Sequence, residues 1–163
     1  DSSPDLPPPP CPVDGVPCDD GDPTTIGDVC KGGTCVPGLQ ETCKKIDADI
    51  DCGDWDHWDL WTDDVHGATN AACDHDKMDW YDTIYRFVAP KTGTVDVWVS
   101  GYGGSSDTWV AYVLAGACNP AACMKWDFGF SVGLDFQAEA GRTYYIVVEG
   151  SSWDSYSLSV DCE

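Results

Sequence analysis

The sequence predicts an all-β fold: an antiparallel β-sandwich or jelly roll, with a small disulfide-stapled N-terminal module. Two observations predict it. Over the second half of the chain, apolar and polar residues alternate with a period of two, in short runs separated by turn residues. Ten cysteines in 163 residues indicate an oxidising compartment, where disulfides persist. We therefore expect a secreted or extracellular protein.

The first part of the chain, residues 1–10, is rich in proline and ends in the run LPPPP. Consecutive prolines favour polyproline II, a stiff extended conformation, and the alternative is a disordered spacer. We expect an ordered N-terminal arm. Because the sequence starts at Asp1 without methionine, it is consistent with a mature form whose signal peptide has been removed, or with cleavage of a tag.

The second part, residues 11–38, is rich in cysteine and turn residues. So short a piece cannot bury enough apolar surface alone, so we expect disulfides to hold it together. Three pairings are open. Its cysteines are Cys11, Cys18, Cys30 and Cys35.

The third part, residues 39–163, contains the strands of the predicted sandwich. In three segments, GTVDVWVSG, SVGLDFQAEAG and SYSLSVDC, alternate residues are apolar. The turns between strands contain PKTG, GYGGSSD and EAGR. The residues predicted to share apolar faces are Val95, Val97 and Val99, then Val132, Leu134, Phe136 and Ala138, and last Tyr156, Leu158, Val160 and Cys162.

The charge excludes several classes of partner. With 29 acidic and 8 basic residues, the net charge is −21, which opposes binding to nucleic acid or to an anionic membrane surface. No run of about 18 apolar residues is present to span a membrane. The natural partners of such a surface are cations, Ca²⁺ first. The alternative is that acidity only keeps the protein soluble.

No catalytic constellation is visible in the sequence. Serines occur in GYGGSSD and GSSWDS, but neither is a nucleophile elbow, and no histidine is placed to activate one. The abundant aspartates do not single out a glycosidase pair. We expect the chain not to be an enzyme.

One candidate calcium site lies in the cysteine-rich module. Oxygen ligands recur there at alternate positions, as in the first part of an EF-hand loop. An EF-hand itself is excluded, because Thr25 replaces the turn glycine and Lys31 the bidentate glutamate. The alternative is a turn whose aspartates bond to their own backbone. The candidate ligands are Asp20, Asp22, Thr24, the carbonyl of Ile26, and Asp28.

A second candidate calcium site lies in the larger part, around NAACDHDKMDWYD and GSSD. Carboxylates so close in sequence repel one another unless a cation or ordered water lies between them. The candidate ligands are Asn70, Asp74, Asp76, Asp79, Asp82 and Asp107.

Eight tryptophans offer a binding surface, most densely in DCGDWDHWDLWTDD. On a strand, Trp55 and Trp61 share a face and Trp58 opposes them, so we expect at least one to be exposed. Trp98 is predicted to lie on the other face of its strand from Val95, Val97 and Val99. One hypothesis is that these rings cap a small core; another is that they stack on sugars.

A third hypothesis joins the arm to the tryptophans. Polyproline segments dock in aromatic-lined grooves at low entropic cost. Residues Leu6, Pro7, Pro8, Pro9 and Pro10 of one copy would lie on the aromatic face of the next. Such a contact is head-to-tail and does not close, so it builds a filament or surface layer.

The larger part resembles the bacterial pre-peptidase C-terminal domain over about residues 43–163. The resemblance is carried, in order, by GATN and the Cys73 that follows it, YDTIYRFVAPKTGTVDVWVSG, CNPAAC, FQAEAGRTYYIVVEG and YSLSVDC. It implies a non-catalytic β-sandwich appended to secreted enzymes and surface proteins, in which related domains use Ca²⁺ to order a terminal linker. The leading module is similar to a short cysteine-rich bacterial repeat, through CDDGDPTTIGDVCKGGTC. Many copies have a further cysteine where Thr24 stands, which leaves the pairing open.

Two disulfides are predicted in the larger part. We predict that Cys118 and Cys123 pair across a tight loop, and that Cys162 staples the last strand to the region near Cys43 or Cys52. The function predicted is a non-enzymatic extracellular structural or adhesive subunit, stabilised by calcium and self-assembling through its arm. The alternatives are a carbohydrate-binding module that uses exposed tryptophans, and an accessory domain of a secreted enzyme.

Overall fold

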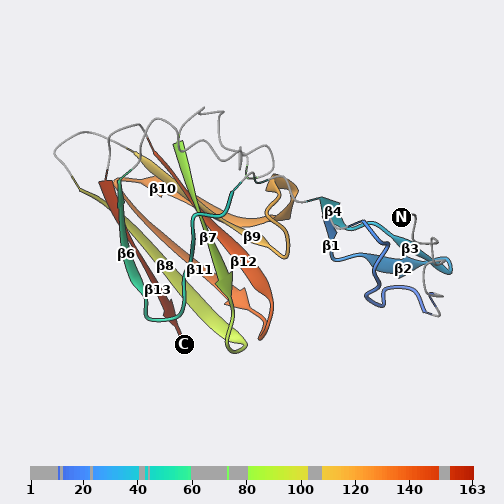
Figure 1. Cartoon of the computed structure of the whole chain (residues 1–163). Coiled ribbons are helices and arrows are strands. Elements are labelled where there is room, and N and C mark those ends of the chain that lie inside the picture. The colour runs from blue at the N-terminus through green and yellow to red at the C-terminus, as the bar shows by residue number, and fades with distance from the viewer. Residues whose placement is uncertain are drawn as a thin grey trace, which may run out of the picture. The chain divides into compact units, whose positions relative to one another are not determined.

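The structure is a computed structural model of the whole chain (Figure 1). It describes residues 11, 13–22, 24–40, 43, 45–59, 73, 81–102, 108–150 and 155–163. The chain divides into two compact units, Asp1–Glu41 and Thr42–Glu163. The predicted division after residue 38 falls slightly earlier, because residues 39 and 40 pair within the small unit.

Cysteines and turns organise the small unit. Cys30 and Cys35 face each other across a two-stranded sheet, and each forms a disulfide to an earlier loop: Cys11–Cys30 and Cys18–Cys35. These sulfur atoms are buried or half-buried and form the apolar centre of the unit. Its strands are β1 (Thr25–Ile26), β2 (Val29–Lys31), β3 (Thr34–Val36) and β4 (Leu39–Gln40).

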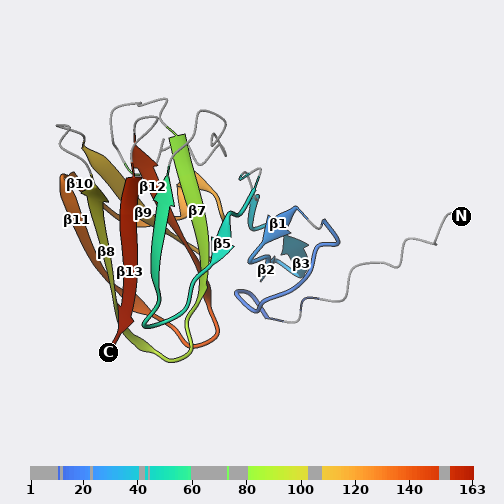
Figure 2. The ribbon, with the colours of Figure 1, turned by 60° about the vertical axis from the view of Figure 1, so that its left-hand side comes forward.

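The larger unit is the predicted antiparallel β-sandwich (Figure 2). Among the described pairs of its two sheets, the short pairing of β5 with β7 is parallel. In its described part, one sheet has the strand order β10-β9-β12-β7-β5 and the other β11-β8-β13-β6. The strands are β5 (Ala48–Asp49), β6 (Trp55–Asp59), β7 (Tyr81–Val88), β8 (Gly93–Tyr102), β9 (Trp109–Ala115), β10 (Cys123–Gly129), β11 (Ser131–Ala138), β12 (Thr143–Gly150) and β13 (Ser155–Cys162), with a 3-10 turn η1 (Pro120–Ala122). No helix in the described residues is long and apolar enough to cross a membrane.

The core lies between the two sheets, where the period-two pattern predicted it. In β11, every second residue from Val132 to Ala138 is buried and the residues between are exposed. The valines of β8 and most of the predicted face of β13 join the same cluster. Inside it, the hydroxyls of Tyr85 and Tyr156 share a hydrogen bond of 2.8 Å, so neither is left unpaired by burial.

Three disulfides staple the larger unit, and they correct one prediction. Cys52 pairs with Cys162, one of the two alternatives predicted. The predicted Cys118–Cys123 bond is wrong. Cys118 pairs with Cys43, and Cys123 pairs with Cys73. The two cysteines lie on either side of η1, Cys118 before it and Cys123 at the start of β10, and each bonds to a partner far away in sequence.

Candidate functional site

The outer face of the sheet β11-β8-β13-β6 carries a row of side chains that crosses four strands. The register aligns Gly133 with Trp98, Trp98 with Ser159, and Ser159 with Trp55. Trp98 projects to the outside because the valines that alternate with it in β8 fill the core. Trp55 of β6 is paired with the outward Ser159 of β13, so it lies on the same side of the sheet. Trp55 is 62% exposed and Trp98 is 54% exposed. We call the surface formed by Trp55, Ser159, Trp98 and Gly133 the tryptophan face.

Local contacts fix where the two indoles lie. A Cβ added to Gly133 would come 2.8 Å from Cζ3 of Trp98, so the Trp98 ring lies over this glycine. Trp55 is stacked on the next outward residue of its own strand, His57, with ring centroids 6.3 Å apart and planes 13° apart. The floor between the indoles is Ser159. Gly133 beneath Trp98 and Ser159 between the two tryptophans are small, and both indoles remain more than half exposed and open to a ligand.

A row of aspartates runs beside the tryptophan face. Asp135, Asp96 and Asp161 are cross-strand neighbours, and all three are exposed. Lys125 donates a hydrogen bond of 2.6 Å to Asp135 and holds the pKa of that carboxyl below its usual range. Among the described residues, no cation pairs with Asp96 or Asp161. We call these three residues the acid row.

The other sheet carries a buried carboxyl pair on its outer face. Glu149 of β12 lies opposite Asp82 of β7, and they are 4% and 3% exposed. The Tyr112 hydroxyl donates to Glu149 Oε1 at 2.6 Å. Burial raises the pKa of Glu149 to about 7, with the Asp82 charge adding to the rise and the Tyr112 hydrogen bond opposing it. Burial likewise raises the pKa of Tyr112.

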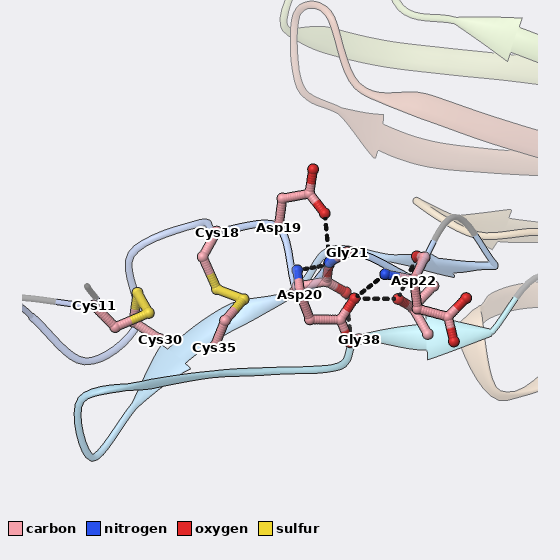
Figure 3. Close-up of a disulfide and its surroundings, with 11 residues drawn as sticks. Cys11, Cys18, Asp19, Asp20, Gly21, Asp22, Cys30, Cys35 and Gly38 are labelled. Atoms are coloured by element: carbon pink, nitrogen blue, oxygen red, sulfur yellow. Dashed lines mark hydrogen bonds between the residues drawn. A yellow bond between two sulfur atoms is a disulfide. The ribbon is translucent and has the colours of Figure 1, made fainter. Parts of the chain in front are cut away.

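The aspartates of the small unit form an ordered loop (Figure 3). Asp19 accepts from the N–H of Gly21 at 2.8 Å, and Asp20 accepts from the N–H of Asp22 at 2.9 Å. Asp28 is 6% exposed and accepts from the N–H groups of Asp20 and Gly38. These backbone bonds lower the pKa of Asp28.

The same loop brings three carboxylates together. Ligand oxygens of Asp19, Asp20 and Asp28 lie within 4.8 Å of one another. Two of these residues, Asp20 and Asp28, belong to the predicted ligand set. The third, Asp19, replaces the predicted Asp22, whose carboxylate accepts from Thr24 instead. The loop thus contains the self-bonded turn that was the alternative, and also a cluster that suits a hard cation.

Several predicted residues lie outside the described part of the chain. They are the arm residues Leu6, Pro7, Pro8, Pro9 and Pro10, the tryptophan Trp61, and the candidate ligands Asn70, Asp74, Asp76, Asp79 and Asp107. Trp58 is placed in β6 opposite Tyr156, but its side chain is not described. The calcium site of the larger unit therefore stays a prediction, with Asp82 as its one described residue.

Two groups of residues were not predicted from the sequence. Asp135 and Asp161 join Asp96 only through strand pairing, which the sequence does not show. Glu149 follows the apolar run YYIVV, so its placement beside Asp82 depends on the register between β12 and β7. For Asp135 and Asp161 the signal available was an acidic residue within a predicted strand, and for Glu149 it was an acidic residue directly after an apolar run.

Comparison with known proteins finds similarity only at the level of solved structures. No protein-family model matches the chain, and no curated protein matches it. Among solved structures, the pre-peptidase C-terminal domain of a collagenase from Bacillus anthracis is similar, with 19% sequence identity and a TM-score of 0.46. The alignment covers 72% of this chain and 97% of that chain. On its own geometry, the larger unit is a disulfide-stapled antiparallel β-sandwich with an aromatic outer face.

Proposed function

We propose that the chain is a non-catalytic extracellular attachment module that binds its ligand on the tryptophan face. One observation carries the proposal: two large indoles are more than half exposed on one face of a stapled sheet. Exposing indoles costs hydrophobic free energy, and such patches mark interaction surfaces. The five disulfides are typical of a protein that works outside the cell.

A carbohydrate ligand suits this face best. Pyranose rings present flat apolar faces to indoles, and hydroxyl groups find acceptors in the aspartates and serines nearby. The face is formed by strand side chains. In the described sheet, β8 and β13 are paired on both sides, and β6, which carries Trp55, is paired with β13. A preorganised face loses little conformational entropy on binding.

Self-association through the arm is the second candidate. The Cα atoms of Trp55 and Trp98 are two strand spacings apart, about 10 Å. One turn of polyproline II is about 9 Å long, so prolines three residues apart match this separation. The arm also carries Asp1 and Asp5, which the acid row repels. We therefore place this candidate second.

The test measures binding and particle size with the full disulfide-bonded chain. The wild type, a Trp55→Ala/Trp98→Ala double variant and a Phe130→Ala control are applied to an array of immobilised polysaccharides. Phe130 is 66% exposed and lies outside the face, so it matches the loss of an exposed ring. We expect the wild type and the control to bind, and the double variant to lose binding. Equal binding by all three would refute the proposal.

Sedimentation velocity separates the two candidates. If the arm docks on the next copy, the wild type forms particles larger than a monomer, and removing residues 1–10 dissociates them. If the ligand is a glycan, the chain stays monomeric and the array signal survives removal of the arm.

A further inference from the structure

We propose that the ligand of the tryptophan face is a linear polysaccharide of amino sugars with free amines, lying across the strands of the sheet. This inference depends on the proposed function, because it names the ligand class of the same face. Three properties of the face support it: its shape, its dimensions, and the position of its charges.

The shape selects a ribbon-like ligand. The row from Gly133 through Trp98 and Ser159 to Trp55 crosses all four described strands. The next outward row on one side consists of small residues, Ser131, Ser100 and Ser157, and of His57. Among the residues that the structure describes, only the serine side chain of Ser159 lies between the two tryptophans in this row. A flat polymer therefore fits along the row, perpendicular to the strands.

The dimensions suit separate rings of one 1→4-linked chain. The Cα atoms of the two tryptophans are about 10 Å apart, and the Trp98 ring lies away from Trp55, over Gly133, so the two indoles are further apart than their Cα atoms. In a β-1,4-linked chain, successive rings are flipped, so every second ring presents the same face and the same edge. Two rings of one chain that present the same face can thus stack on Trp55 and Trp98, while the chain between them passes above Ser159.

The charges select the substituent at the edge of the ligand. The acid row runs parallel to the tryptophan row, two residues further along each strand, which is about 7 Å. Like charges on directly opposite residues destabilise a sheet, and Lys125 offsets only the Asp135 charge. A ligand on the indoles therefore presents its edge to Asp96 and Asp161, two carboxylates without a cation among the described residues. An ammonium group at that edge of the ligand lies beside these two carboxylates and offsets their charge.

Other ligands satisfy only part of this arrangement. A neutral glycan stacks on the indoles but leaves the acid row without a counter-charge. An acidic glycan is repelled by the row and by the net charge of −21. A basic peptide matches the charge but does not offer a regular repeat of flat apolar rings.

The test compares two ligands that differ only in the amine. Hexamers of β-1,4-linked glucosamine and of its fully N-acetylated form are titrated into the full chain at low salt and about pH 5.5, above the ordinary pKa of a free carboxyl side chain. We expect the free-amine hexamer to bind at least about tenfold more tightly. Salt should weaken its binding more than that of the acetylated hexamer, because exposed charges are screened.

Variants assign the effect to the acid row. Asp96→Asn/Asp161→Asn should reduce affinity for the free-amine hexamer about tenfold and leave the acetylated hexamer unchanged. Asp127→Asn is the matched control, because Asp127 is exposed on β10 of the other sheet and bonds through Oδ1 to its neighbour's N–H, which asparagine keeps. It should bind both hexamers as the wild type does.

The outcomes separate this inference from the proposed function. Equal affinity for the two hexamers, with loss of both in Trp98→Ala, overturns the amine preference and leaves the attachment function standing. An oligoarginine peptide that displaces the hexamer and binds more tightly overturns the sugar ligand. Unchanged binding in both tryptophan variants overturns both proposals.

Discussion

Replacing Glu149 with glutamine should remove a large pH dependence from the stability of the sandwich. The carboxyl is 4% exposed, and its pKa rises from 4.5 to about 7 on folding, chiefly through burial. The folded state thus binds a proton more tightly than the unfolded state does. Ionising this buried carboxyl therefore lowers the free energy of unfolding. The loss is absent below about pH 4.5, grows as the pH rises to 7, and reaches about 3 kcal/mol at pH 8.

The assay is urea unfolding in EDTA at several pH values between about 4.5 and 8, for the wild type and Glu149→Gln. We expect the two to have similar stability at the acid end and the variant to be more stable by up to about 3 kcal/mol at pH 8. Tyr112→Phe removes the hydrogen bond that opposes the pKa rise, so its loss of stability should continue to higher pH and be larger in total. Glu139→Gln, at an exposed glutamate, is the control. Parallel pH profiles for wild type and Glu149→Gln would show that this reasoning is wrong.

Three further predictions concern glycines and calcium. Gly101→Ala should destabilise the chain by about 2 kcal/mol in urea unfolding, because a Cβ there overlaps the buried Trp109 indole; an unchanged midpoint would contradict this. Gly133→Ala displaces the exposed Trp98 ring, so binding to the polysaccharide array should fall while stability changes by less than about 1 kcal/mol; unaltered binding would count against the face. Ca²⁺ should raise the midpoint of thermal unfolding relative to EDTA, and Asp28→Asn should reduce that rise. An equal rise in the wild type and the variant would contradict a calcium site in the small unit.

The strands of the sandwich were predictable because their pattern is local. The alternation in SVGLDFQA reports the two faces of β11 directly, and burial follows it residue by residue. The exposed side of β8 was predictable for the same reason, since Trp98 alternates with three valines.

Pairing between distant segments was not predictable. Cys118 and Cys123 are close in sequence, which favoured a bond between them, yet their partners are Cys43 and Cys73. Which cysteines meet depends on how the loops at one end of the sandwich are arranged, and no local rule specifies this.

The candidate site shows the same division. Sequence alone indicated Trp55 and Trp98 as candidates, but only the register of β6, β13 and β8 aligns them in one row. The acid row depends on the same register. If the register of any of these strands shifted by one residue, the side chains that this strand contributes to the two rows would turn toward the core.

The most direct test of the central claim is to follow the indole N–H signals of the full ¹⁵N-labelled chain by NMR during titration with the glucosamine hexamer. Single substitutions assign the signals of Trp55, Trp98 and the buried Trp109. We predict that the signals of Trp55 and Trp98 move together along one binding curve while that of Trp109 stays in place. Saturable binding that leaves both exposed indole signals unmoved would contradict the account.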